Sequence, residues 1–501
     1  MPKTASVELD HALEPFVLAL DVGSTASRGG LYDAAGRPVR GLRHKVPHQF
    51  RTASDGTSEI DPDAVLAEVA EVITEVTGRL PGRRRIAGVA LDTFASSLVG
   101  VDDDGAPLTP CYTYADSRCA PQLRQLRGEL DEAAVQQRTG TRLHTSYLPP
   151  RLRWLRETAP DTFARAARWL SLGEYVHLRL LGTTAVGTST AAWTGMLDRR
   201  AGAWDAEMLT AAGVDAGHLS EIRDPDRPLR DDGRAGRRWP ALTGAAWFPV
   251  ITDGFASNIG AGAGDESVIA AAAATSGAMR VVLHGHPDTI PPGLWCYRVD
   301  ASRTLLGGAL NDVGRVVSWL EDTLRLDQDG LAVDREAALL APPDDGAPVV
   351  LPYLTGERST GWAGGARALF ADVTAATTPT LLYRGALEGV ALTYARVAEQ
   401  LQQAGGRAHR IAASGRVTAD HPAWLQVLAD ALGAPVEHVT MKRTTLHGTA
   451  LIALEVLAPD VPRAPVETGR TYVPVAGRTE YYATRRTRYQ QLYEAVVAPT
   501  G

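Results

Sequence analysis

The sequence predicts an α/β protein built from two halves that meet near residue 248. Three observations support this fold class. Strand and helix signals alternate along the chain, a new strand-rich block begins at residue 246, and each half contains a strand that ends in a turn of small and hydroxyl residues. At 501 residues the chain is long enough for more than one domain. We therefore expect an N-terminal domain over residues 1–247 and a C-terminal domain over residues 248–501.

The segment 16–28 is the most informative part of the first half. It predicts a buried apolar strand that ends at Asp21, a turn, and a second strand that resumes over 29–32. A carboxylate at a strand end can hold Mg²⁺, usually through water, and a glycine turn brings backbone N–H groups close to phosphate oxygens. The turn consists of Gly23, Ser24 and Thr25, and the two hydroxyls add donors. An ordinary hairpin with polar turn residues is the alternative for this segment alone.

The remaining elements follow from composition and periodicity. In the first half we expect strands over 85–91 and 97–101, helices over 148–156 and 174–181, and a loop over the charged, Gly/Pro-rich segment 222–238. In the second half we expect strands over 246–251, 268–277 and 279–283, a long helix over about 380–403, and a helix after Asp420 with Pro422 in its first turn and Gly433 at its end.

The second half repeats the strand-end turn and adds a carboxylate. The turn Ala274–Gly277 resembles the first one in its small and hydroxyl residues, which suggests two loops that hold one phosphate chain from opposite sides. The echo is too short to establish an internal repeat. Asp253 follows an apolar strand, where its carboxylate could accept a proton from an attacking hydroxyl. An ordinary Asp-Gly turn is the alternative.

Composition excludes several classes of partner. The net charge of −7 argues against nucleic acid, and no run of about eighteen apolar residues predicts a membrane span. The first ten residues have early acids and no apolar core, unlike a signal peptide. Three cysteines neither pair up nor show metal-ligand spacing. We expect a cytoplasmic protein that binds a small molecule; a homodimer is open as a further partner.

Taken in order, these motifs resemble the FGGY carbohydrate kinases over residues 16–497. The matching segments are 21–28, 98–110 with 114–118, 253–254, 274–277, 354–359, 384–390, 413–415 and 424–430. The family's fold is the two-domain actin/hexokinase-like (ribonuclease H-like) type with an interdomain cleft. Within the family, residues 139–144 and 356–358 are most similar to gluconokinase-like members.

The resemblance implies ATP-dependent phosphorylation of a hydroxyl on a sugar, sugar acid or related polyol, with ATP and Mg²⁺ as cofactors. It implies that Asp253 is the general base and that Asp21 helps to place the metal. The residues implied to contact the nucleotide are Gly23, Ser24, Thr25, Arg28, Thr275, Ser276, Gly277, Gly314, Gly415 and Arg416. The residues implied to contact the substrate are Ala95, Ser96, Asp116, Arg118, His144 and Asp253.

Departures from the family pattern concern the substrate most. Ala95 and Ser96 stand where related kinases usually carry a bulky residue and a histidine, and Tyr114 replaces the usual tryptophan. These changes predict a wider pocket, although neutral drift is the alternative at each position. Arg416 occupies the second glycine of the usual adenosine turn, where it could stack on adenine or obstruct it. Gluconate is the default substrate, with an unusual amino sugar or cyclitol as the runner-up.

Other readings stay open at this stage. His144 could touch the substrate or be structural, and Asp116 and Arg118 could bind sugar hydroxyls or pair with each other. The altered segments also allow a catalytically weak nucleotide- or sugar-binding regulator. The presence of Asp21 and Asp253 together favours the enzyme, because a binding protein would not need both a metal position and a base position.

Overall fold

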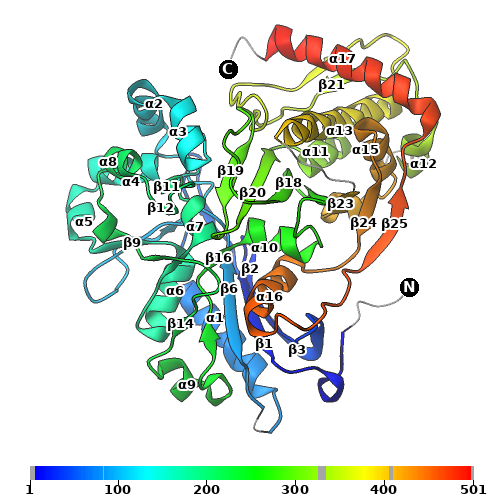
Figure 1. Cartoon of the computed structure of the whole chain (residues 1–501). Helices are drawn as coiled ribbons and strands as arrows, with labels where there is room; N and C mark the ends of the chain where they lie inside the picture. Colours follow the sequence, from blue (N-terminus) through cyan, green and yellow to red (C-terminus); the bar gives the residue numbers. More distant parts are fainter. Residues whose placement is uncertain (1–5, 83, 325–334, 405–409, 498–501) are drawn as a thin grey trace.

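A computed structural model describes residues 6–82, 84–324, 335–404 and 410–497 (Figure 1). The segment on which we based the absence of a signal peptide therefore lies partly outside the described residues. Two seven-stranded sheets organise the described chain. None of the helices in these ranges has both the length and the apolar character needed to cross a membrane.

The first sheet has the strand order β14-β15-β6-β1-β2-β3, and β16 also pairs with β6. Its strands are β1 (Val17–Val22), β2 (Ala26–Tyr32), β3 (Pro38–Pro47), β6 (Gly88–Thr93), β14 (Leu229–Arg230), β15 (Ala246–Trp247) and β16 (Ile251–Thr252). β1 and β2 form the predicted antiparallel hairpin, and β1 runs parallel to β6. All six residues of β1 are buried, as its apolar sequence predicts.

The second sheet has the order β19-β20-β18-β17-β23-β24-β25. Its strands are β17 (Val268–Ala273), β18 (Gly277–His284), β19 (Trp295–Arg298), β20 (Arg303–Leu310), β23 (Arg410–Ser414), β24 (Val436–Val439) and β25 (Thr468–Tyr472). β17 pairs antiparallel with β18, β18 with β20, and β17 runs parallel to β23. The strands β3, β2, β1 and β6 of the first sheet have the same arrangement, so the short echo seen in the sequence is a repeat at the level of topology.

The helices and short strands connect and cover these sheets. The helices are α1 (Pro62–Gly78), α2 (Ala120–Glu129), α3 (Glu132–Thr139), α4 (Leu148–Thr158), α5 (Pro160–Arg165), α6 (Leu172–Leu181), α7 (Thr188–Ala192), α8 (Ala206–Ala212), α9 (Arg234–Arg238), α10 (Asp253–Gly260), α11 (Gly314–Leu324), α12 (Arg335–Leu340), α13 (Pro379–Gln403), α14 (Arg416–Asp420), α15 (Trp424–Leu432), α16 (Thr444–Leu457) and α17 (Thr479–Val496). The short strands are β4 (Arg51–Thr52), β5 (Ser58–Ile60), β7 (Val99–Val101), β8 (Cys111–Tyr112), β9 (Arg168–Leu170), β10 (Val186–Gly187), β11 (Leu197–Asp198), β12 (Ala203–Trp204), β13 (Ile222–Arg223), β21 (Val349–Leu351) and β22 (Leu369–Ala371).

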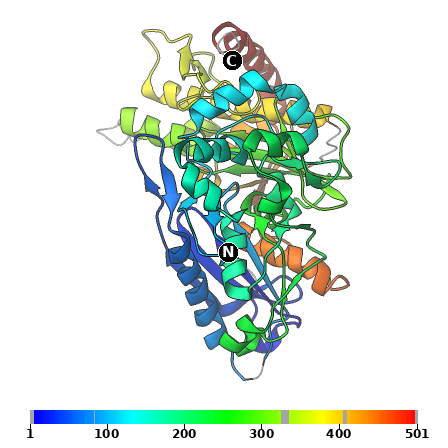
Figure 2. The same cartoon turned by 90° about the vertical axis from the view of Figure 1, so that its left-hand side faces the viewer.

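α1 and α16 cover opposite faces of the first sheet (Figure 2). Neighbouring residues of β2 show this alternation, because a Cβ at Gly29 would lie 2.4 Å from Val72 of α1, whereas one at Gly30 would lie 3.5 Å from Leu446 of α16. α16 comes from the C-terminal part of the chain, and β16 and α10 also join the first sheet or pack near it. The domain boundary at 247/248 stays a prediction, since β16, which belongs to the first sheet, lies beyond it.

Three local expectations are wrong in detail, each for a physical reason. The expected strand 246–251 is interrupted into β15 and β16, because Pro249 lies between them and has no N–H to donate to a ladder. The expected loop 222–238 contains β13, β14 and α9, elements too short to leave a periodic signal. Pro422 precedes α15 in a tight turn, where the Leu425 N–H donates to its carbonyl at 3.1 Å.

The crossing of α10 and α16 depends on two glycines. A Cβ at Gly260 would lie 1.8 Å from the Thr444 carbonyl oxygen, and a Cβ at Gly448 would lie 1.8 Å from the Ala256 carbonyl oxygen. No carbon atom fits at such distances, so the helix backbones touch directly. Because α10 begins at Asp253, this contact fixes where that carboxylate stands relative to the first sheet.

Gly448→Ala is therefore expected to destabilise the protein by about 1–3 kcal/mol through overpacking. The matched control is Gly128→Ala in α2, where nothing lies within 4 Å of the added carbon and alanine improves helix propensity. Calorimetric melting temperatures of the two variants provide the measurement. A Gly448→Ala melting temperature equal to that of the control would contradict the close contact.

Candidate active site

Three aspartates meet at one edge of the first sheet. Asp21 and Asp92 are register partners on the parallel strands β1 and β6. On the other side of β6, Ile251 of β16 pairs with Asp92, and Asp253 begins α10 directly after that strand. Carboxyl ends of parallel strands meet at one edge of a sheet, and ligands bind there in open α/β sheets. Asp92 was not among the residues predicted from the sequence.

Each carboxylate has a different environment. Burial raises the pKa of Asp253 to about 6, with Arg280 opposing the rise and Asp21 adding to it. The backbone N–H groups of Ala95 and Gly254 donate to the Asp253 carboxylate. Ala95 thus faces Asp253 with its backbone, a contact that does not depend on its side chain.

Asp92 and Asp21 are balanced by other partners. Burial raises the pKa of Asp92 well above its ordinary value, and Asp21 raises it further. The Thr449 hydroxyl of α16 lies in hydrogen-bond contact with one Asp92 oxygen, and the other oxygen is buried without a partner among the described residues. Burial also raises the pKa of Asp21, against the effect of Arg28. Burial thus favours the uncharged form of Asp92, which lowers its repulsion with the two other carboxylates.

The first turn is organised by Arg28. Its guanidinium donates to Asp21 Oδ2 at 3.1 Å and to Thr25 Oγ1 at 3.2 Å. A side chain at Gly23 would approach Arg28 Nη1 to 3.2 Å, so the glycine leaves room for this ion pair. Ser24 and Thr25 are exposed at the tip of the turn. The residues of the predicted first phosphate turn are therefore brought together.

His48 supports the same turn and was missed by the sequence analysis. Its Nε2 lies 2.8 Å from the Gly23 carbonyl oxygen, and its Nδ1 lies 2.7 Å from Glu68 Oε2 of α1. Its backbone N–H donates to the Thr25 carbonyl at 3.1 Å. The available signal was the hairpin itself, because the end of β3 pairs with the start of β2 and brings His48 beside the turn.

The second turn is held by the start of α11. The N–H of Gly314 donates to the Ala274 carbonyl at 2.8 Å, and the N–H of Arg315 donates to the Thr275 carbonyl at 3.2 Å. Thr275 and Ser276 are exposed, like the hydroxyl residues of the first turn. A Cβ at Gly314 would lie 2.6 Å from the Ala274 oxygen, so this position requires glycine.

Two further glycines leave room for close contacts beside this turn. A Cβ at Gly277 would lie 2.3 Å from the Tyr394 hydroxyl, and Gly415 has a φ of 117° with its Cβ position 2.3 Å from the Ala273 oxygen. Arg416, the next residue, donates to Asp420 at 2.9 Å and its side chain is 87% exposed. Its contact with a nucleotide stays a prediction.

An aromatic wall stands beside Asp253. Ser96, with a φ of 55°, donates its hydroxyl to the Trp193 carbonyl at 2.6 Å. The Trp193 ring stacks on Tyr297 with centroids 3.6 Å apart, and a Cβ at Gly254 would lie 3.1 Å from Trp193. The Ser96 hydroxyl therefore already donates its proton to a protein acceptor. A role for this position in substrate choice rests on the shape of its loop.

Asp116 and Arg118 pair with each other. Asp116 is only 1% exposed and accepts from Arg118 at 2.6 Å and from the Ser58 N–H at 3.0 Å. Arg118 also donates to Glu59 at 2.9 Å. Both side chains are engaged in one ion network, and their contact with a substrate stays a prediction.

His144 is a neutral donor in this arrangement. Its Nδ1 accepts from the Ser146 N–H at 3.1 Å, which places the ring proton on Nε2. Burial lowers the pKa of His144 to about 3, and Arg358 lowers it further. The ring lies 6.3 Å from the Trp362 ring, measured between centroids. The geometry allows His144 Nε2 to donate to a substrate hydroxyl.

A magnesium ion would find few protein ligands here. In the described ranges no group of three or more His, Cys, Asp or Glu side chains is arranged to hold a metal. Mg²⁺ usually keeps several waters and uses one or two carboxylates together with phosphate oxygens. Asp21, at the end of β1 beside the first turn, could bind Mg²⁺ in this way. Its carboxylate would then interact with both the ion and Arg28.

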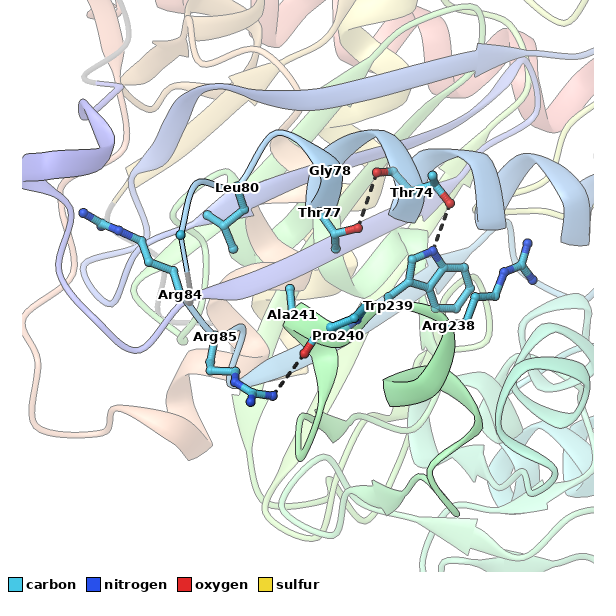
Figure 3. A pocket seen from close by; sticks show the side chains of 11 residues that line it. Thr74, Thr77, Gly78, Leu80, Arg84, Arg85, Arg238, Trp239, Pro240 and Ala241 are labelled. Atoms are coloured by element: carbon cyan, nitrogen blue, oxygen red, sulfur yellow. Dashed lines mark hydrogen bonds between the residues drawn. The ribbon is translucent and has the colours of Figure 1, made fainter.

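A separate hollow of about 590 Å³ lies at the opposite edge of the first sheet (Figure 3). It is enclosed by the end of α1, the loop before β6, and the segment after α9. Trp239 is fixed there by a hydrogen bond from Nε1 to Thr74 Oγ1 at 2.9 Å. None of the predicted site residues lines this hollow.

Comparisons with known proteins match both halves of the chain. Residues 16–229 match the N-terminal domain of the FGGY family of carbohydrate kinases, and residues 272–455 match the C-terminal domain. A gluconokinase of Bacillus subtilis is 26% identical over 88% of this chain and 87% of its own, and a glycerol kinase of Allorhizobium ampelinum is 28% identical over 87% and 89%. A gluconate kinase structure from Lactobacillus acidophilus is 24% identical, covers 96% of this chain and 98% of its own, and has a TM-score of 0.88. This likeness confirms the two-domain α/β fold.

His48→Ala is expected to loosen the first turn. Loss of a hydrogen bond worth about 1 kcal/mol would accelerate amide exchange at Gly23–Ala26 roughly fivefold. The control is His44→Ala, since His44 lies on β3, the strand just before His48, but pairs with Glu71 at the surface. Hydrogen–deuterium exchange of peptides over 20–30 provides the measurement. Equal exchange in the two variants would show that His48 does not support the turn.

Proposed function

We propose, since the chain belongs to the FGGY family of carbohydrate kinases, that it transfers the γ-phosphoryl group of ATP to a hydroxyl of a sugar, sugar acid or related polyol. Asp253 is the general base in this proposal. The single observation that carries it is the position of Asp253, at the start of α10 beside Asp21 and next to an aromatic wall.

Asp253 has the properties that a base needs. With a pKa of about 6, the Asp253 carboxyl group is mostly ionised at pH 7. A pKa this close to the working pH also lets the carboxylate accept a proton readily. Two backbone N–H groups orient the carboxylate, and the contact between α10 and α16 fixes the helix that carries it. Phosphoryl transfer depends chiefly on such positioning and on charge stabilisation.

The two hydroxyl-bearing turns would hold the phosphates of ATP. Ser24 and Thr25 stand on the first sheet, and Thr275 and Ser276 on the second, all exposed to solvent. In this proposal Asp21 holds Mg²⁺ through water, and the ion neutralises phosphate charge. The proposal also divides the chain into domains at 247/248, so that each domain contributes one of the two turns.

The substrate within this class is not decided by the relatives, which include gluconokinases and glycerol kinases at 25–28% identity. Gluconate is the default, and the small residues Ala95 and Ser96 motivate an amino sugar or cyclitol as the alternative. A coupled assay of ADP release over sugars, sugar acids, alditols and cyclitols decides between them. A chain that binds ATP but releases no ADP with any of these would be a weak binding protein.

Asp253→Asn is expected to lower kcat by about 10²–10⁴-fold, because the amide keeps the shape but cannot accept the proton. ATP affinity should stay within about twofold when measured by titration calorimetry. The control is Asp104→Asn, an exposed aspartate in a surface turn. Near-normal kcat in Asp253→Asn would exclude this residue as the base.

The rate is also expected to depend on pH through the same group. Because protonated Asp253 cannot accept a proton, kcat/KM should fall about tenfold per pH unit below a pKa of about 6 and level off above it. The pH profile of kcat/KM between 4.5 and 8, with protein stability checked at each value, provides the measurement. A flat profile through pH 5 would contradict the assignment.

A further inference from the structure

Two arginines near Asp253 form no salt bridge with a carboxylate of the described residues. Arg280 lies on β18, and its Nη1 approaches Ser257 Oγ, one turn beyond Asp253 in α10, at only 3.4 Å. Arg358 lies in the segment between β21 and β22, and its guanidinium makes no hydrogen bond to any described residue. Within the described ranges neither guanidinium has a carboxylate oxygen within 4.0 Å.

Neighbouring arginines behave differently. Arg396 pairs with Glu357 at 2.9 Å, immediately beside Arg358 in the sequence. Arg28 pairs with Asp21 at 3.1 Å.

Buried arginines without a carboxylate partner, such as Arg151 and Arg199, donate to backbone carbonyls instead. Among the described residues, Arg280 and Arg358 have neither kind of acceptor. Leaving charges partly desolvated without a partner is costly unless another group compensates them.

The positive charge of the pair extends across the candidate site. Arg280 opposes the rise in the pKa of Asp253, and Arg358 lowers the pKa of His144 and Arg280. Burial raises the pKa of Tyr114, Asp253 raises it further, and Arg358 opposes the rise, so Tyr114 lies within reach of both charges.

The segment of Arg358 lies against β20, where the Ser359 N–H donates to the Ala309 carbonyl at 3.0 Å, and β20 pairs with β18, which carries Arg280. The two arginines therefore bring two positive charges to the part of the molecule where Asp253 lies.

We propose that Arg280 and Arg358 form a carboxylate-binding subsite, so that the acceptor substrate is a sugar acid rather than a neutral sugar or alditol. Guanidinium groups bind carboxylates through paired, charge-assisted hydrogen bonds. The inference rests on the proposed function, because it assumes that Asp253 receives the proton of a hydroxyl on the same molecule. The alternative anion that these arginines could bind is the transferred phosphoryl group. The experiment below distinguishes a substrate carboxylate from the phosphoryl group.

The test compares matched pairs of acceptors: D-gluconate with D-glucitol, and D-galactonate with galactitol. The natural protein should favour at least one acid over its alditol by 100-fold or more in kcat/KM. Arg358→Gln should lose about 10–100-fold for the acid, mainly through KM, and change little for the alditol. Arg280→Gln should raise KM for the acid in the same way. Because loss of its charge also raises the pKa of Asp253, this variant is compared on the alkaline plateau of its own pH profile. Arg280→Lys should restore part of the loss. Arg410→Gln, an exposed arginine on β23 paired with Glu437, is the control.

Binding to the Asp253→Asn variant gives a readout that does not need turnover. Calorimetry should detect the preferred acid but not its alditol, and Arg358→Gln in that background should abolish the difference. Equal use of acid and alditol by the natural protein would overturn the subsite. An equal loss for both acceptors in kcat would assign the arginines to the phosphoryl group and overturn it as well. Absence of ADP release with every acceptor, with acid binding intact, would instead reject the proposed function and leave the subsite standing.

Discussion

The direct backbone contact between α10 and α16 is the constraint on which the candidate site depends. Gly260 and Gly448 allow the two helices to touch without side chains between them. α16 packs on β1 and β6, whose ends carry Asp21 and Asp92, and its Thr449 reaches Asp92. α10 begins at Asp253. One contact therefore sets the relative position of three carboxylates that are far apart in the sequence.

Such a group of like charges is stable only because each carboxylate has a different compensation. Arg28 neutralises Asp21 by an ion pair, and Asp92 is buried with a raised pKa against Thr449. Asp253 receives two backbone N–H groups and the charge of Arg280. Different environments thus separate the pKa values of these neighbouring carboxyl groups.

The sequence was informative where chemistry is local. The hairpin around Gly23 and the turn at Ala274–Gly277 follow from buried strands that end in small residues, and the long helix α13 follows from its periodicity. His48, Asp92 and Arg280 could not be found in this way, because their roles arise from pairing across strands and helices. The sequence offered the pairing of Asp116 with Arg118 as one of two alternatives and could not choose between them, since the contact with Glu59 comes from another segment.

The structure changes the meaning of the small residues at 95 and 96. From the sequence they predict a wider pocket, by deletion of two large side chains. In the structure the Ala95 N–H donates to Asp253, and Ser96 adopts a positive φ and donates its hydroxyl to the Trp193 carbonyl. A positive φ is unfavourable for most side chains, so a larger residue at Ser96 would alter the loop that presents this N–H. The two positions therefore link the shape of this loop to the orientation of the Asp253 carboxylate.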